Sequence, residues 1–274
     1  MRKPRITTHG YRRRAAIQAS LKRMDYCPSM RVEPREMPLV PFMGREIFVF
    51  GENYSEGVVI MDIVLKDGSK MKIDGPVTVG EIAQAISPGL ARVAVGALVD
   101  GKMMGMNEPV TGGQVQILTF KDELGKKIFW HTASHILAHA VKRLYPQAKL
   151  AIGPAIDTGF YYDFDIEPAF TQEDLIKIEA EMGKIVKEGL TLERYTLPKA
   201  EALKAMVEEP YKVELIEERP EGETISFYKQ GDFTDLCAGP HLDSVKGVKA
   251  FKLINLAGAY WRGDEKNKML TRIY

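Results

Sequence analysis

The sequence predicts an α+β protein with two folded domains: a small β-grasp (ubiquitin-like) module over residues 61–120 and a larger α+β domain over residues 121–274. Three observations support this. Short strand patterns separated by Asp-Gly turns fill the first region. A long helical pattern with three histidines opens the second region, and mixed helix and strand patterns follow to residue 274. Residues 1–60 form a basic leader.

Composition limits the classes of protein that fit this chain. Of its 274 residues, 45% are hydrophobic and 27% are charged, as in ordinary globular proteins. No apolar run reaches the ~18 residues that a membrane span requires, so we expect no membrane partner. The two cysteines, Cys27 and Cys237, lie in unrelated contexts. This spacing excludes a disulfide scaffold and favours a reducing, cytoplasmic location.

The leader carries 11 Lys and Arg against 6 Asp and Glu, although the net charge of the whole chain is only +1. Residues 11–24 could form a basic helix. The leader can be an organellar transit peptide, a disordered tail or sequence ahead of a mis-called start. We favour a true start at Met61, because a strand begins there and Ser55-Glu56-Gly57 can be encoded by a purine-rich stretch resembling a ribosome-binding site. Without the leader the net charge is negative, so a nucleic acid must be held by local patches.

Residues 61–120 show the order of elements of a β-grasp module. Asp67-Gly68 and Asp100-Gly101 suit tight turns between strands. Thr78 is a suitable N-cap for a helix that Ser87-Pro88-Gly89 would end. The expected elements are strands 62–66 and 70–73, helix 79–86, and strands 93–99 and 115–119. The module has no histidine or cysteine, which indicates a binding or accessory role.

The next region carries the residues suited to chemistry. A helix is expected from residue 124 to 145, where Pro146 ends it. His131, His135 and His139 recur at i, i+4 and i+8, so they lie along one stripe. A zinc protease would need Glu directly after the first histidine, where Thr132 stands instead. Buried hydrogen-bonding histidines are the alternative interpretation, and we assign His139 such a structural role.

A second short motif favours a functional role for the histidines over a structural one. Residues 235–241 read DLCAGPH, which places Cys237 and His241 on one Gly-Pro turn. With His131 and His135 they form a set that could bind zinc tetrahedrally or carry protons. Cys237 alone could instead be a buried small apolar residue. We expect the four side chains to converge.

The remainder of the larger domain is expected to be scaffold. Thr171 caps a helix that runs to about Glu188, and Pro198 opens another. Segments 223–229 and 250–254 read as strands. The helix after Thr171 has one apolar face, formed by Leu175, Ile178, Met182 and Ile185. Three basic residues form a local edge that could touch RNA phosphates or belong to a solvated turn: Arg262, Lys266 and Lys268.

From Met61 onward, the chain resembles the N-terminal part of bacterial-type threonyl-tRNA synthetases. The matching strings are residues 131–139 (HTASHILAH), 151–163 (AIGPAIDTGFYYD), 235–241 (DLCAGPH) and 257–264 (AGAYWRGD), running on to Arg272-Ile-Tyr274. The resemblance implies a TGS domain over 61–120 and an aminoacyl-tRNA editing (second additional) domain over 121–274. In that family, the class II catalytic core and an anticodon-binding domain follow. We therefore expect neither ligation nor ATP binding from this chain, which would be a truncated product, an isolated domain pair or a free-standing editing factor.

The same resemblance implies hydrolysis of serine wrongly attached to tRNA(Thr). His131 and His135 would position water or the terminal ribose, and Cys237 and His241 would form the opposite wall. Further residues belong to the site by resemblance alone: Lys212 to stabilise developing negative charge or protonate the leaving group, Asp235 to orient a neighbour or bind the seryl amine, and Tyr162 and Gly153 to line the substrate pocket.

Cofactor and partners follow from the resemblance as expectations. We expect no cofactor to be required, although related alanyl-type editing domains hold zinc with the pattern His131, His135, Cys237 and His241. The partner is the 3′ end of tRNA(Thr) carrying serine, with a separate or full-length threonyl-tRNA synthetase as a second partner. The oligomeric state stays open. The alternatives are an alanyl-type, zinc-dependent editing factor and a non-catalytic tRNA-binding fragment.

Overall fold

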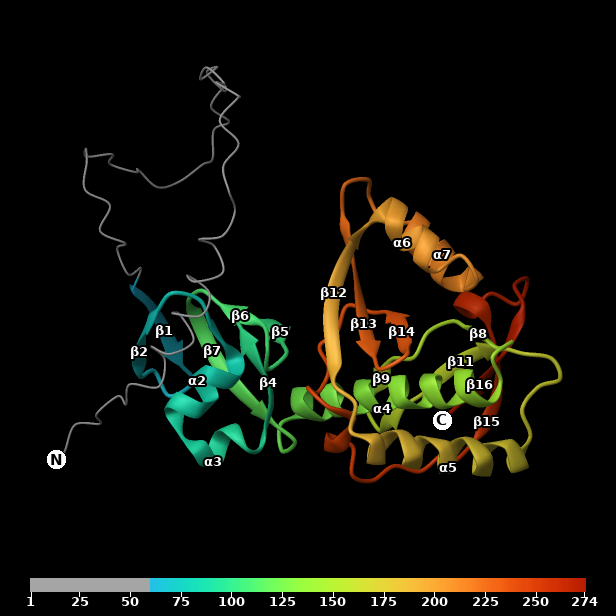
Figure 1. The fold of residues 1–274 in the computed structure, drawn as a ribbon, viewed down its shortest axis with the longest axis horizontal. Helices are drawn as coiled ribbons and strands as arrows, with labels where there is room; N and C mark the ends of the chain where they lie inside the picture. The colour runs from blue at the N-terminus through green and yellow to red at the C-terminus, as the bar shows by residue number, and fades with distance from the viewer. Residues whose placement is uncertain (1–59) are drawn as a thin grey trace, which may run out of the picture. The chain divides into compact units, whose positions relative to one another are not determined.

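The computed structural model describes residues 60–274 (Figure 1). Three predictions concern residues 1–59, which lie outside the described residues. They are the basic helix, the transit peptide and the start at Met61. Within residues 60–274, no helix combines the length and the apolar character needed to cross a bilayer.

The first domain is a β-grasp sheet with a helix packed on it. Its five strands lie in the order β2-β1-β7-β4-β5, and β1 and β7 run parallel while the other neighbours are antiparallel. The strands are β1 (Ile60–Leu65), β2 (Lys70–Asp74), β4 (Ala94–Val99), β5 (Lys102–Met104) and β7 (Gly113–Thr119). A small second ladder joins β3 (Val77–Thr78) and β6 (Pro109–Val110). Helix α2 (Val79–Ile86) buries Val79, Ile82 and Ala83. The predicted fold class is confirmed.

The turns and the helix cap predicted for this domain are present, and one short helix was not predicted. Gly68 and Gly101 have φ of +81° and +82°, which glycine adopts without strain. Thr78 caps α2 and forms a reciprocal capping box with Glu81. The segment from Ser87 ends α2 but also begins a further short helix, α3 (Pro88–Ala91), because its hydroxyl accepts from the Leu90 N–H.

Helix α4 (Glu123–Leu144) is the centre of the second domain, and the helix predicted over 124–145 is confirmed. Helix α5 (Gln172–Glu188) packs beside it. An antiparallel sheet in the order β15-β16-β11-β8 completes this layer: β8 (Lys149–Leu150), β11 (Tyr162–Asp165), β15 (Leu256–Tyr260) and β16 (Met269–Ile273). The apolar face predicted for α5 is buried as expected.

A second, three-stranded sheet lies in the order β12-β13-β14. Its strands are β12 (Leu192–Pro198), β13 (Thr224–Gln230) and β14 (Phe233–Leu236), and helices α6 (Lys199–Ala205) and α7 (Pro210–Glu217) precede β13. The two helices and the sheet share a small core that includes Met206, Ile216 and Phe227. A short hairpin of β9 (Ala155–Ile156) and β10 (Gly159–Phe160) packs on α4.

The strand expected over 250–254 is wrong. This segment has no regular structure, and β15 begins only at Leu256. Its backbone is held by other groups: the Leu253 N–H donates to the Glu179 carboxylate at 2.9 Å, and the Ile254 N–H donates to the Tyr274 carbonyl. A distant side chain therefore replaces a strand ladder, which short-range pattern does not reveal.

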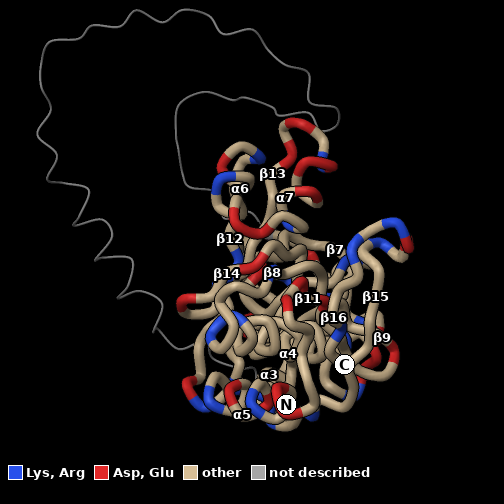
Figure 2. The backbone as a smooth tube through the Cα atoms, turned by 90° about the vertical axis from the view of Figure 1, so that its right-hand side faces the viewer, with Lys and Arg blue, Asp and Glu red and all other residues tan. Residues whose placement is uncertain are grey.

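Two of the three side chains of the predicted basic edge, Arg262 and Lys268, are paired with acids. Arg262 contacts Glu214 at 2.8 Å and Glu218 at 2.6 Å, and Lys268 contacts Asp165 at 2.8 Å. Figure 2 shows Asp and Glu gathered around α7 and the start of β13. This pairing favours the solvated-turn interpretation of the edge over RNA binding.

Replacing Thr171 tests the cap of α5. Its hydroxyl accepts from the Asp174 N–H, while the Asp174 carboxylate accepts from the Thr171 N–H. Thr171→Ala should lower the free energy of unfolding by about 1 kcal/mol, measured by urea denaturation. Gln172→Ala, an exposed neighbour in the same turn, is the control. Equal stability of the two variants would contradict the capping role.

Candidate active site

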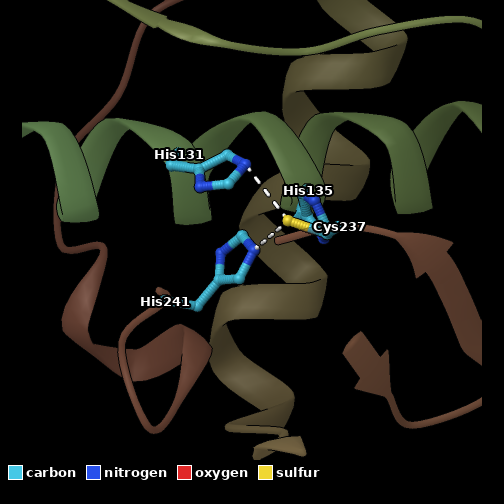
Figure 3. A group of neighbouring side chains, drawn as sticks. All are labelled: His131, His135, Cys237 and His241. Atoms are coloured by element: carbon cyan, nitrogen blue, oxygen red, sulfur yellow. Dashed lines mark hydrogen bonds between the residues drawn. The ribbon is translucent and has the colours of Figure 1, made fainter. Parts of the chain in front are cut away.

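The four side chains that were predicted to converge lie together in the structure. His131 and His135 extend from one face of α4, and Cys237 and His241 come from the loop after β14 (Figure 3). The Cys237 Sγ lies 3.3 Å from the His131 Nε2 and 3.1 Å from the His241 Nε2. One nitrogen or sulfur from each of the four lies within 4.8 Å of the others. Residues about a hundred positions apart thus form one polar cluster.

Burial keeps this cluster uncharged. It lowers the pKa of His131 to about 4 and that of His135 to about 3, although the Asp235 carboxylate opposes both shifts. Burial also holds the pKa of His241 well below its ordinary value. The three imidazoles are therefore neutral at pH 7 and available as proton acceptors or metal ligands.

The thiol of Cys237 is protonated at neutral pH, because burial raises its pKa to about 12. A thiolate is the nucleophilic form of cysteine. This environment therefore argues against covalent catalysis by Cys237 and agrees with a role in shaping the wall of the site.

A buried ion pair lies next to the cluster. The Lys212 Nζ, from α7, lies 2.7 Å from the Asp235 Oδ1, from β14, and the two residues are only 3% and 1% exposed. Burial by itself raises the pKa of Asp235, but the Lys212 ammonium, His135 and the hydrogen bonds from Lys212 and Tyr162 together outweigh that effect, and the pKa ends below its ordinary value. Asp235 is thus a carboxylate, and its Oδ2 lies 3.8 Å from the His135 Nε2. The charged pair and the neutral cluster form one continuous network.

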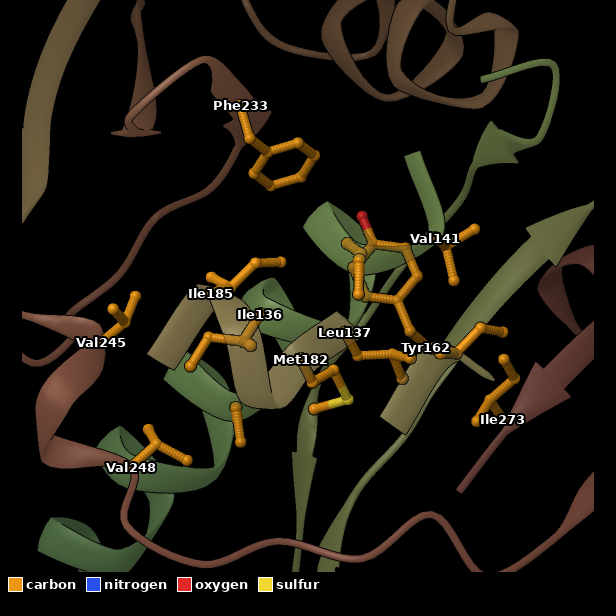
Figure 4. Packing of buried hydrophobic residues seen from close by; sticks show 14 of the residues in the cluster. Ile136, Leu137, Val141, Tyr162, Met182, Ile185, Phe233, Val245, Val248 and Ile273 are labelled. Carbon is orange, nitrogen blue, oxygen red and sulfur yellow. The ribbon is translucent and has the colours of Figure 1, made fainter. Parts of the chain in front are cut away.

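Tyr162 lies between this network and the hydrophobic core. Its ring packs in the core with Leu137, Val141 and Ile273 (Figure 4), while its hydroxyl donates to the Asp235 Oδ2 at 2.6 Å. The Lys212 Nζ donates to the same hydroxyl at 3.1 Å. The ammonium, carboxylate and phenol therefore lie against one another inside the protein, although the Asp235 Oδ1 has only the ion-pair contact with Lys212 and no hydrogen bond of good geometry.

Gly153 lies against the ring of Tyr162, so close that a Cβ at this position would overlap the ring. Its carbonyl accepts a hydrogen bond from the Ser134 hydroxyl at 2.7 Å. Gly153 was predicted as a substrate-binding residue. In the structure it allows Tyr162 to stand where its hydroxyl reaches Asp235.

A pocket of about 220 Å³ opens onto this site. Its lining includes Lys127, His131, Pro154, Ala155 and Pro240. Among the four clustered side chains, His131 is the one that lines this pocket in the described part of the chain. A ligand entering here would therefore meet His131 first.

His139, assigned a structural role from sequence, lies apart from the cluster. It bonds Gln230 at 2.9 Å, Asp232 at 3.0 Å and Arg143 at 3.0 Å, and it stacks on Phe233. Neither Thr132 nor Ser134 was predicted from the sequence to belong to the site, and Thr132 served only to exclude a zinc protease. Both are fully buried and hydrogen-bonded at the site. The two hydroxyls within the HTASH string were the available signal.

The donor set fits a zinc ion. Two or three imidazoles with one thiolate is an ordinary zinc ligand set, and ligands on a tetrahedral zinc ion lie about 3.3–3.8 Å from one another. The contacts of Cys237 with His131 and His241, at 3.3 and 3.1 Å, are close to that range. All four donor atoms lie within 4.8 Å of one another, so the group can hold a metal once its wider contacts close.

Two family descriptions match the chain. The TGS domain matches residues 61–119, and the "Threonyl and Alanyl tRNA synthetase second additional domain" matches residues 225–274, which include Asp235, Cys237 and His241. Fold and site thus define a TGS domain followed by a second additional domain of the threonyl and alanyl tRNA synthetases.

Within that class, the chain carries the TGS and second additional domains of the threonyl-tRNA synthetase family. It is 62% identical over 226 residues to the threonine--tRNA ligase of Caldanaerobacter subterraneus subsp. tengcongensis, covering 81% of this chain and 35% of the relative. It is 61% identical to the threonine--tRNA ligases of Acetivibrio thermocellus and Clostridium tetani, over 78% of this chain and 34% of each relative. The resemblance seen in the sequence is confirmed. The chain spans about a third of the length of these relatives.

Separating the buried ion pair should cost more than removing it. Asp235→Asn leaves the Lys212 ammonium without its counter-ion and should lower the free energy of unfolding by about 3–5 kcal/mol. The double variant with Lys212→Met should recover part of that loss, as measured by urea denaturation. Additive effects of the two single substitutions would show that the pair does not interact.

Proposed function

We propose that this chain hydrolyses the ester bond of aminoacyl-tRNA, and specifically removes serine from tRNA(Thr). The observation that carries the proposal is the neutral imidazole of His131 at the pocket, backed by His135 and by the buried Lys212–Asp235 pair. Ester hydrolysis at neutral pH needs a proton acceptor, a cationic group and a dry, shaped site. The second additional domain supplies all three.

Hydrolysis begins with the attack of water on the ester. The oxygen of a water molecule bonds to the acyl carbon, and its proton passes to the neutral imidazole of His131 or His135. The bond between the acyl carbon and the ribose oxygen then breaks, and the imidazolium passes its proton to the ribose oxygen and returns to the neutral form. The products are free serine and tRNA with an intact 3′ end. Lys212 is buried and is not among the residues that line the pocket, so its charge would act on the developing negative charge of the acyl oxygen from behind His135 and Asp235 and not by direct contact.

The closed network restricts what Asp235 can do. Both of its oxygens already face Lys212 or Tyr162 within 2.7 Å. This arrangement favours an orienting role for Asp235, through Lys212 and His135, over direct binding of the seryl amine. In this reading Asp235 and Tyr162 are positioning residues.

The need for such an activity follows from the size of the substrate difference. Serine and threonine differ by one methyl group, which a binding pocket discriminates by only ~1–3 kcal/mol. A second site that accepts the smaller seryl ester and destroys it raises the accuracy. A pocket of about 220 Å³ beside His131 suits a small acyl group.

The acidic surface limits how tRNA can approach. Acidic side chains gather around α7 (Figure 2), and because Glu214 and Glu218 pair with Arg262, this region offers no free positive charge to phosphates. The pocket instead carries Lys127 at its edge, and its side chain is 43% exposed. The 3′ end of the tRNA would enter on this side.

Metal is the point on which two candidate functions differ. We propose that hydrolysis needs no cofactor, because the neutral imidazoles and Lys212 supply the required groups. The donor set favours one alternative, an alanyl-type, zinc-dependent editing factor. In that case His131, His135, Cys237 and His241 would hold the ion, which would activate water as a Lewis acid when bound.

The deacylation assay tests the proposal directly. The purified chain should hydrolyse seryl-tRNA(Thr) and leave threonyl-tRNA(Thr), the internal control, intact. His131→Ala should lower the rate by about 100-fold or more, because it removes the proton acceptor at the pocket. A folded chain that binds tRNA yet leaves both esters intact would make it a non-catalytic tRNA-binding fragment.

Metal dependence is tested in the same samples. Treatment with a chelator, with zinc counted by mass spectrometry before and after, should leave the rate of seryl-tRNA(Thr) hydrolysis unchanged. Stoichiometric zinc whose removal abolishes hydrolysis, and whose return restores it, would establish the zinc-dependent alternative.

A further inference from the structure

Thr132 stands between the two histidines of α4 and is fully buried. Its hydroxyl makes three contacts: with the Ile128 carbonyl at 2.9 Å, with the Leu242 N–H at 3.0 Å and with the His241 Nδ1 at 3.4 Å. Two of these partners belong to the loop that follows β14. The hydroxyl therefore connects α4 directly to the segment that carries Cys237 and His241.

The number of protons available decides the direction of each bond. A threonine hydroxyl has one proton to donate and two lone pairs that accept. The Ile128 carbonyl can only accept, and at 2.9 Å it is the shortest contact, so the hydroxyl proton points to it. The Leu242 N–H can only donate and occupies one lone pair. The second lone pair faces the His241 Nδ1 at 3.4 Å, and a hydrogen bond between them then requires a proton on Nδ1.

A neutral imidazole carries one proton, so a proton on Nδ1 leaves the Nε2 with a lone pair. The His241 Nε2 lies 3.1 Å from the Cys237 Sγ, on the side where the four clustered side chains meet (Figure 3). We propose that Thr132 is a positioning residue that fixes the Nδ1–H tautomer of His241 and thereby turns the His241 Nε2 lone pair into the site.

This inference rests on the proposed function for its catalytic meaning. In hydrolysis, a fixed lone pair on His241 accepts a hydrogen bond from the Cys237 thiol or from a water molecule. The same hydroxyl holds the loop through Leu242, so it sets both the position and the protonation pattern of the far wall. A second hydroxyl on α4 performs a separate task, since Ser134 bonds Gly153.

The tautomer can be measured without any assay of activity. Long-range ¹H–¹⁵N correlation spectra of the chelator-treated chain at pH 7 distinguish Nδ1–H from Nε2–H imidazoles, and loss of a signal in His241→Asn assigns the ring. We expect His241 to be the Nδ1–H tautomer in the unsubstituted chain and in Thr132→Ser. Thr132→Val, which lacks the hydroxyl, should show a mixture or the Nε2–H form.

Kinetics supply the second readout. Thr132→Val should lower kcat for seryl-tRNA(Thr) by about 10–100-fold while KM changes by less than about threefold, and Thr132→Ser should restore it. Tyr145→Phe is the matched control, because it removes a hydroxyl that links α4 to α5 through Asp174, about 20 Å along the helix from Thr132.

The outcomes separate the two proposals. An Nε2–H tautomer for His241 in the unsubstituted chain would overturn the role of Thr132, whatever the activity. An unchanged tautomer and unchanged kcat in Thr132→Val would overturn it as well. A chain that does not hydrolyse the ester, but whose His241 tautomer follows the hydroxyl at residue 132, would overturn the proposed function and leave the role of Thr132 standing.

Discussion

The candidate site depends on one electrostatic constraint: an ammonium and a carboxylate, Lys212 and Asp235, are held together away from water. A buried charge is tolerated only when a partner lies against it and its other polar contacts are satisfied. That requirement explains why Tyr162 must present its hydroxyl at this point and why Gly153 must lack a side chain. The position of α7 follows as well, since it brings Lys212 to β14. His135 then lies beside a fixed charge pair, with its Nε2 3.8 Å from the Asp235 Oδ2.

A charged pair and neutral imidazoles therefore lie within a few ångströms of each other. Burial drives the imidazoles of His131, His135 and His241 to their neutral forms, whereas mutual attraction keeps Lys212 and Asp235 ionised. Proton acceptors and a cation thus coexist without neutralising one another. Had the carboxylate lain beside a histidine without the lysine, the histidine would have become the cation and lost its capacity to accept a proton.

Elements with strong local signals were predictable from sequence. The capped helices α2 and α5, the Asp-Gly turns and the helix ended by Pro146 rest on short-range chemistry, and they stand where expected. The convergence of the DLCAGPH loop with α4 was also predictable, because ligand-type residues were rare and grouped. What could not be predicted was set by distant partners: Glu179 holding the segment before β15, the acids that neutralise Arg262, and the contacts of Thr132. The roles of Lys212 and Gly153 were accessible only through family resemblance.

The position of β16 in its sheet has a consequence for the order of events during synthesis. β11, which carries Tyr162, pairs with β8 on one side and with β16 on the other, and Asp163 is opposite Arg272. Two strands so far apart in the chain must meet before Tyr162 is held at Asp235, and such non-local pairing forms late. The neighbour of Tyr162 on the β16 side, Ile273, therefore becomes available to a growing chain only after residue 273 has left the ribosome.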